Sequence, residues 1–108
     1  MEIKRLGPAD DALVIEAGHL FDDPPRPEAV HRFLADPNHN LFVAYIDGKP
    51  VGFVSGVELT HPDKGTEMFL YELAVDEGHR QLGIGMALTT ALRDLAREKG
   101  CYRHVGVD

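Results

Sequence analysis

A glycine-containing loop between two apolar segments constrains this chain more than any other feature. Residues 68–75 form a hydrophobic run, residues 86–99 carry apolar side chains at helical spacing, and the loop between them contains Arg80, Gly83 and Gly85. Glycine has no Cβ atom, so backbone N–H groups can approach a bound group closely, and the following helix start is partially positive. The sequence therefore predicts an anion-binding turn between a strand and a helix, with a phosphorylated cofactor as the ligand.

The rest of the chain divides into short apolar segments separated by turn residues. Runs rich in branched and aromatic residues predict strands at residues 2–6, 41–46, 51–59, 68–75 and 102–107. Apolar side chains at helical spacing predict helices at residues 12–20, 28–35 and 85–99. Asp47 and Gly48 indicate a tight hairpin, and residues 60–65 are expected to form a loop. This order predicts an α+β (mixed α/β) fold, in which helices pack on a largely antiparallel sheet that ends in a parallel β-α-β unit over residues 75–107.

Length and charge narrow the class of protein. With 108 residues, the chain is expected to form one domain over residues 1–108. Eighteen acidic and eleven basic residues give a net charge of −7, which disfavours nucleic acid as a partner. The charge favours a cationic small molecule, although acidity also serves solubility. No apolar stretch is long enough to cross a bilayer, and residues 1–5 lack the apolar segment of a signal peptide, so we expect no membrane partner and a cytoplasmic location.

The cysteine and histidine content predicts neither a disulfide nor a metal site. Cys101 is the single cysteine, so it cannot form an internal disulfide, and its neighbours indicate a position in the core. The six histidines show no ligand spacing and have no cysteine cluster beside them. We therefore expect no metal.

The loop carries a motif found in a known family. Val75, Arg80, Gly83 and Gly85 stand at the spacing V-x4-R-x2-G-x-G, which resembles the acetyl-coenzyme A motif of the GNAT superfamily of N-acetyltransferases. More narrowly, residues 71–85 resemble aminoglycoside N-acetyltransferases that modify the 3-amino group and carry an acidic residue after the tyrosine. The resemblance covers the chain as the N-terminal part of the family fold. It implies a GNAT-like sheet without the family's usual last helix and strands, so we expect the exposed last strand to favour a homodimer.

The resemblance also implies acetyl-CoA, or coenzyme A, as the cofactor. Backbone amides of the loop and of the first helical turn would bind the pyrophosphate, with added charge from the arginine. This set comprises Arg80, Gln81, Leu82, Gly83, Ile84, Gly85 and Met86. Leu73, Ala74 and Val75 would offer backbone groups to the pantetheine arm, much as an open strand edge pairs with a peptide. The alternative is a glycine-containing turn that merely starts a helix.

Several acidic residues are candidates for the acceptor side of the site. Glu72 is the single charge in its strand and could act as a general base toward an amine, directly or through water, or it could be a solvated surface residue. Tyr71 falls on the opposite face by alternation, where a core position competes with contact to the substrate. Asp22, Asp23 and Glu28 border a proline-rich loop and could bind an ammonium-rich substrate, or they could simply be solvated.

The leading hypothesis is an N-acetyltransferase. A primary amine, with an aminoglycoside as one candidate, would attack acetyl-CoA directly, without a covalent enzyme intermediate. An aminoglycoside acceptor would imply antibiotic resistance. One alternative is a truncated, non-catalytic module that binds CoA or a partner chain. A dinucleotide-binding oxidoreductase is disfavoured, because Leu88 replaces the third glycine of that fingerprint and the chain is short for its sheet.

Overall fold

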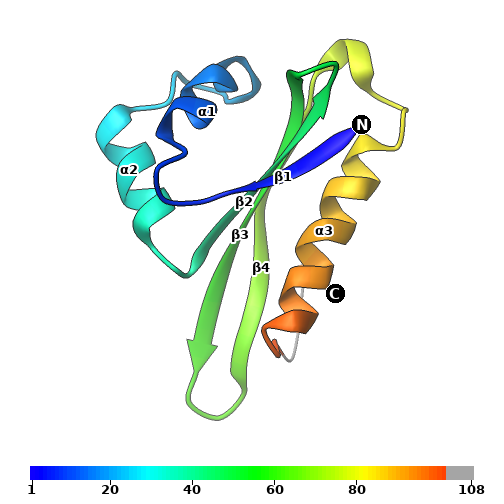
Figure 1. Ribbon diagram of the computed structural model, residues 1–108. Helices are drawn as coiled ribbons and strands as arrows, with labels where there is room; N and C mark the ends of the chain where they lie inside the picture. Colours follow the sequence, from blue (N-terminus) through cyan, green and yellow to red (C-terminus); the bar gives the residue numbers. More distant parts are fainter. Residues whose placement is uncertain (102–108) are drawn as a thin grey trace.

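Within residues 1–101, a four-stranded antiparallel sheet in the order β1-β2-β3-β4 separates two helical layers (Figure 1). The computed structural model describes residues 1–101. Its strands are β1 (Glu2–Leu6), β2 (His39–Ile46), β3 (Lys49–His61) and β4 (Gly65–Val75). Its α-helices are α1 (Asp11–Glu16), α2 (Pro27–Ala35) and α3 (Ile84–Glu98), and its 3-10 turns are η1 (Gly18–Leu20) and η2 (Glu77–His79). The predicted antiparallel sheet flanked by helices is confirmed, whereas the strand predicted at residues 102–107, with its parallel unit and dimer edge, lies outside the described residues.

Both faces of the sheet are apolar because helices cover both of them. In β2, Leu41 and Val43 point into the core under α1 and α2, whereas Phe42 and Ala44 point into the core under α3. Figure 1 shows α1 and α2 on one side of the strands and α3 on the other. The helical spacing of apolar residues predicted for α3 is confirmed, because Leu88, Leu92, Leu95 and Ala96 are buried, and Ile84 is buried as well.

The two hairpins differ in how well the sequence predicts them. Asp47 and Gly48 have φ angles of 51° and 76°, as the predicted tight turn between β2 and β3 requires. The loop expected over residues 60–65 is too long, because β3 continues to His61 and β4 begins at Gly65. Polar cross-strand pairs continue the ladder beyond the core, including Thr60 and Thr66, whose hydroxyls lie 2.8 Å apart.

The first predicted helix is split into two pieces. α1 ends at Glu16, and η1 follows at Gly18–Leu20. Glycine is a poor helix former, and a Cβ atom at Gly18 would lie 3.2 Å from Cδ of Pro25, so the chain turns where the proline-rich loop packs against it. Ala17 and Leu20 are nevertheless buried, so the apolar pattern correctly identifies the inward side.

β4 contains a bulge at Tyr71. Ser55 pairs with Glu72 and Gly56 pairs with Leu70, which leaves Tyr71 as the extra residue. A bulge sets two residues of one strand against one residue of its partner, so it interrupts the alternation of side chains. The predicted core position of Tyr71 is wrong, because its side chain is 73% exposed and lines the same cavity as Glu72.

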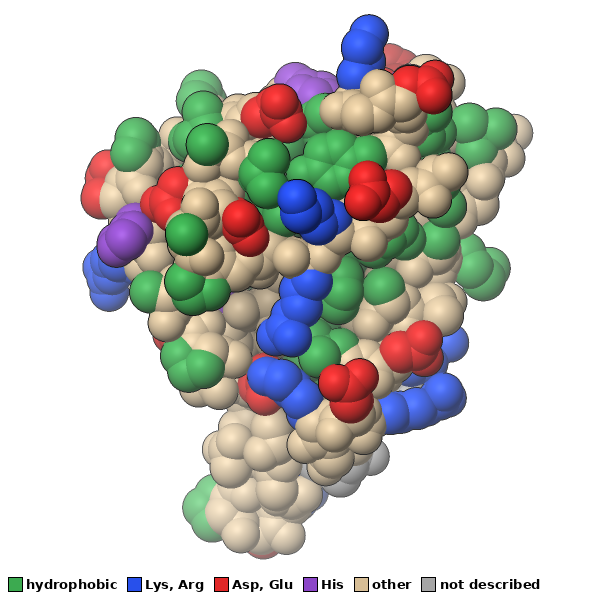
Figure 2. All heavy atoms as spheres, in the orientation of Figure 1, with side chains coloured by type: hydrophobic (Ala, Val, Ile, Leu, Met, Phe, Trp, Pro, Cys, Tyr) green, Lys and Arg blue, Asp and Glu red, His purple; other side chains and the backbone are tan. Residues whose placement is uncertain are grey.

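Charged groups of both signs are interspersed over the face shown in Figure 2, with hydrophobic side chains between them. In the part of the chain that the structure describes, no helix is both long and apolar enough to cross a membrane. Cys101 is half-buried against the core under α3, so the expected core position is only partly met.

Candidate functional site

The start of α3 leaves its first backbone amides without a cap from the protein. Gln81 and Gly83 adopt left-handed φ angles of 68° and 81°, and no side chain caps the helix that follows. The Ala87 N–H donates to the carbonyl of Gly83 at 3.0 Å. The helical N–H groups that precede Ala87 have no intrahelical acceptor, so the turn presents several donors at the positive end of the helix dipole. This geometry suits a bound anion.

The segment before α3 is held in place by its own hydrogen bonds. The Asp76 N–H donates to the Val51 carbonyl at 2.7 Å, and the His79 ring nitrogen Nδ1 lies 2.9 Å from Asp76 Oδ2. Arg80 Nε donates to the Val75 carbonyl at 3.2 Å, which ties this exposed side chain to the end of β4. Arg80 is therefore positioned beside β4, the strand that leads into the anion-binding turn.

Some side chains of the anion-binding turn are buried and others are exposed. Ile84 is only 2% exposed, so it can offer a ligand little beyond its amide. Leu82 and Met86 are 61% and 77% exposed, although both are large and apolar. Exposed apolar groups beside free helical amides would accommodate a ligand that has both a charged and a hydrophobic part.

The first turn of α3 lies beside the last residues of β4. A Cβ atom at Gly85 would be 3.8 Å from both Leu73 Cδ2 and Val75 Cγ2. Leu73, Ala74 and Val75 pair on one side with β3, and among the described strands β4 is at the border of the sheet. Their other side is thus a strand edge adjacent to the anion-binding turn.

Two cavities adjoin the middle and end of β4, and Glu72 lines both of them. The first measures about 240 Å³, lies between β4 and the layer of α1 and α2, and is mainly apolar. The second measures about 640 Å³ and is lined by His19, Leu20, Asp22, Glu72, Leu73, Ala74, Val75, Asp76, Glu77 and Arg80. We call them the apolar cavity and the polar cavity.

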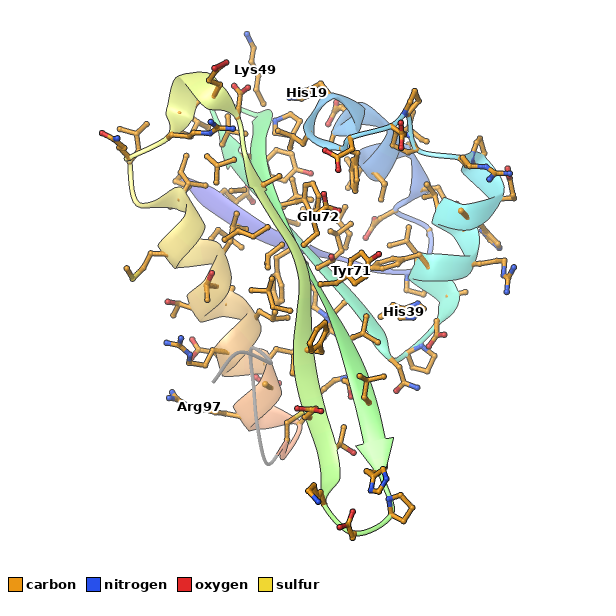
Figure 3. All side chains as sticks on the ribbon, turned by 180° about the vertical axis from the view of Figure 1, so that it is seen from behind. His19, His39, Lys49, Tyr71, Glu72 and Arg97 are labelled. Atoms are coloured by element: carbon orange, nitrogen blue, oxygen red, sulfur yellow. The ribbon has the colours of Figure 1, made fainter. Side chains whose placement is uncertain are left out.

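Glu72 is half-buried at the junction of the two cavities. Figure 3 shows Tyr71 and Glu72 on the part of β4 that faces α1 and α2. Within residues 1–101, the Glu72 carboxylate forms neither a hydrogen bond nor an ion pair with another side chain, so its oxygens are available to a ligand. This position is compatible with a general base and departs from that of a fully solvated surface residue.

The other acidic candidates are not all brought to this junction. Asp22 lines the polar cavity, whereas Asp23 lines only a separate hollow beside the proline-rich loop. Glu28 is paired with Arg26, with 3.1 Å between the charged atoms, and both side chains are exposed. The structure therefore places Asp22 on the same cavity as Glu72, whereas Asp23 and Glu28 line neither of the two cavities at Glu72.

His19 also lines the polar cavity, although it was not among the candidate site residues. Its ring nitrogen Nε2 lies 3.2 Å from the Pro50 carbonyl, which fixes the ring between η1 and the hairpin of β2 and β3. Across residues 1–101, no group of three or more metal-ligating side chains is assembled.

Comparison with known proteins identifies the family. A family model described as the acetyltransferase (GNAT) family matches residues 10–108. A curated relative, the probable N-acetyltransferase camello of Xenopus tropicalis, is 37% identical over 68 residues, which are 63% of this chain. The chain spans only about 30% of the length of that relative.

Solved structures of acetyltransferases share this fold over most of the chain. An aminoglycoside acetyltransferase from an uncultured soil metagenomic sample, in complex with sisomicin, superposes with a TM-score of 0.87 at 28% identity; the match covers 95% of this chain and 74% of that one. A ribosomal-protein-alanine N-acetyltransferase from Brucella melitensis biovar Abortus 2308 has a TM-score of 0.79 at 27% identity, over 96% of this chain and 77% of that one.

Proposed function

We propose, from the premise that this chain belongs to the acetyltransferase (GNAT) family, that it transfers an acetyl group from acetyl-CoA to a primary amine. Acetyl-CoA is the acetyl donor of this family. The observation that carries the proposal is the position of Glu72, where a cavity next to the edge of β4 meets a second cavity. A donor along that edge and an amine at Glu72 would meet at the carboxylate.

The residues of the anion-binding turn suit the phosphates of the donor. The amides from Gln81 to Met86 would accept the pyrophosphate, and Arg80 would add a positive charge. Leu73, Ala74 and Val75 would bind the pantetheine amides through their backbone groups. Uncapped amides at the start of α3 and an open strand edge beside them support this assignment.

Glu72 would act on the acceptor. Bound acetyl-CoA supplies a thioester, and Glu72 takes a proton from the ammonium group directly or through water. The neutral amine nitrogen then forms a bond to the acetyl carbon while the carbon–sulfur bond breaks. The nitrogen releases its second proton to solvent to give the neutral amide, and the released thiolate takes up a proton from solvent. A backbone N–H of Leu73 or Ala74 would stabilise the negative charge that develops on the carbonyl oxygen.

An aminoglycoside is one candidate acceptor, because the soil metagenomic enzyme was solved with sisomicin. If the acceptor is an aminoglycoside, its further ammonium groups would be attracted by Asp22, Asp23 and Glu28, and its 3-amino group would be the one modified. The second solved relative is named for a different acceptor, the alanine of a ribosomal protein. A primary amine is the property that these acceptors share.

Thermal-shift titration and a thiol-release assay test the proposal together. Coenzyme A should raise the melting temperature in a concentration-dependent manner, by an amount equivalent to about 2.7 kcal/mol at a hundredfold excess over the dissociation constant. NAD, which also carries a pyrophosphate, should not. Free thiol should then appear from acetyl-CoA only when an amine is added. A shift without thiol release from a panel of amines would favour the non-catalytic module, and the absence of a shift would contradict the proposal.

A cytoplasmic location and a homodimer remain predictions that accompany this function. Light scattering coupled to size-exclusion chromatography measures the second directly. A mass equal to one chain at micromolar concentration would contradict the dimer without affecting the catalytic proposal.

A further inference from the structure

We infer that the acceptor is an amine with one ring-sized hydrophobic group, and that the apolar cavity receives this group while Glu72 holds the amine. The inference rests on the acetyl transfer proposed above and names its substrate class. It predicts that a polycationic, heavily hydroxylated amine is a poorer acceptor.

The lining of the apolar cavity suits a ring-shaped hydrophobic group. Its wall contains the aromatic rings of Phe21, Phe33 and Tyr71, and the remaining members are Val14, Pro25, Arg26, Ala29, Val30, Leu41, Ser55 and Glu72. Phe21 is fixed by stacking on Phe53, with ring centroids 4.3 Å apart. Rings favour offset or edge contacts with other rings, so an aromatic group would find partners on several sides.

The size of the apolar cavity sets the size of its occupant. A dry cavity of roughly 150 Å³ lined by Leu, Ile and Phe side chains accepts benzene. The apolar cavity measures about 240 Å³, which leaves room for a ring and a short chain. A hydrophobic group of this size would gain affinity by leaving water, because burial of apolar surface is favourable.

The distribution of charge argues against a polycation in the same place. Among residues 1–101, Glu72 is the only acid that lines the apolar cavity, and Arg26 also borders it. Glu28, the nearby acid on α2, is already paired with Arg26. One carboxylate can satisfy one ammonium group, whereas further buried ammonium or hydroxyl groups would need partners that the apolar wall does not offer.

The junction of the cavities fixes the orientation of the acceptor. With the hydrophobic group in the apolar cavity, an amine one or two carbon atoms away reaches Glu72. The same carboxylate borders the polar cavity, which extends along Leu73, Ala74 and Val75 to Arg80. The amine nitrogen would therefore point toward the strand edge proposed to hold the thioester.

The test compares three acceptors by thiol release at saturating acetyl-CoA. The probes are 2-phenylethylamine, ethanolamine, which has a hydroxyl in place of the ring, and sisomicin. We expect kcat/KM for 2-phenylethylamine to exceed that for each of the other two by at least about tenfold, the range expected when a hydrophobic pocket discriminates. A preference for sisomicin, or no preference, would overturn the inference while leaving acetyl transfer itself demonstrated.

A pair of variants makes the test specific to the cavity. Ala29 is exposed on α2 and lines the apolar cavity, so Ala29→Trp would fill it with little demand on the core. The ratio of kcat/KM for 2-phenylethylamine to that for ethanolamine should fall by at least about tenfold. Ala12 on α1 is also exposed and lines none of the described cavities, so Ala12→Trp should leave the ratio unchanged.

A binding measurement separates failure of the inference from failure of the catalytic proposal. Calorimetric titration of 2-phenylethylamine into the protein with CoA present should show binding, and Ala29→Trp should abolish it. Binding that behaves in this way supports the inference even if no amine releases thiol, a result that would count against catalysis alone. Absence of binding at millimolar amine overturns the inference.

Discussion

Glu72 combines accessibility with partial shielding from solvent, and this combination follows from the residue beside it. The bulge at Tyr71 shifts the register of β4 so that Tyr71 and Glu72 line the same cavity. The exposed tyrosine ring forms part of the wall next to the carboxylate. A group that removes a proton from an ammonium ion needs to be within reach of it and to keep its own lone pairs free.

Replacement of Glu72 by glutamine tests this role with almost no change in shape. We expect kcat at neutral pH to fall by roughly a hundredfold, the lower end of what general-base catalysis contributes. The affinity for CoA should remain unchanged, and the deficit should shrink as pH rises and the free amine loses its proton unaided. Thiol release measured from pH 6 to 10 checks both expectations.

Glu67→Gln on the same strand is the matched control, since Glu67 lines none of the described cavities and its replacement should leave the pH profile intact. Normal turnover in Glu72→Gln would mean that Glu72 is a surface residue and not the general base.

Cys101 offers a residue-scale prediction that does not depend on the proposed activity. Burial raises the pKa of its thiol, the negative charge of Glu58 raises it further, and Lys99 partly opposes them. The thiolate is the reactive form, so a raised pKa makes it scarce at neutral pH. Alkylation by iodoacetamide at pH 7.5 should be several-fold slower in the native protein than in denaturant, and should accelerate as pH rises. Equal rates in the two states would contradict the shielded position.

Sequence reasoning at the level of single residues selected Glu72, whose catalytic role stays a prediction, and assigned Tyr71 to the wrong environment, for a physical reason. A lone carboxylate in an apolar strand is visible in the sequence, whereas a bulge without a glycine leaves no local signal. Strict alternation then assigns the wrong face to the residue at the bulge. His19 was missed for a related reason, because the hairpin that holds it is distant in sequence.

At the scale of elements, the two glycines of the anion-binding turn, Gly83 and Gly85, differ in why a side chain would be unfavourable. Gly83 adopts a φ of 81°, so a side chain there would strain the backbone whether or not a ligand is bound. Gly85 lies within α3, and a Cβ atom there would make ordinary contacts of 3.8 Å with Leu73 and Val75. A substitution at Gly85 therefore separates effects on the ligand from effects on folding.

Gly85→Ala should weaken CoA binding by about tenfold or more, because its methyl group would enter the space between α3 and the end of β4. The melting temperature of the free protein should stay constant or rise, since alanine in a helix is favoured over glycine by roughly 0.5–1 kcal/mol. Titration calorimetry and thermal melts measure the two quantities separately. Unchanged affinity would remove this part of the turn from the ligand site.

The elements that the sequence predicts well are those with a strong local pattern. The hairpin at Asp47 and Gly48 and the stripe of α3 depend on turn chemistry and on helical periodicity, both of which are local. The break at Gly18 and the continuation of β3 to His61 depend on contacts with Pro25 and with the opposite strand. Such contacts become visible only when distant segments are placed together.

At the scale of the whole molecule, the site depends on how closely α3 packs against the sheet. Gly52 and Gly56 of β3 face α3, where Leu88 and Leu92 occupy the space that a side chain would need. Because α3 packs this closely on the sheet, its first turn lies next to the end of β4. The packing of helices on an antiparallel sheet could be predicted from the order of the elements, but this close approach could not.

Gly56→Ala tests the close approach directly. A Cβ atom there would lie 2.7 Å from Leu92 Cδ1 and 3.1 Å from Met68 Sδ, and both side chains are fully buried. Overpacking of this kind costs roughly 1–3 kcal/mol, and each kcal/mol lowers the melting temperature by about 4–8 °C in a domain near this size. We therefore expect a fall of at least about 4 °C, measured by circular dichroism. Gly7→Ala, where a Cβ atom meets nothing within 4 Å, is the matched control and should change the melting temperature little. An unaltered melting temperature in Gly56→Ala would mean that α3 packs farther from the sheet, and the anion-binding turn would then no longer be aligned with the edge of β4.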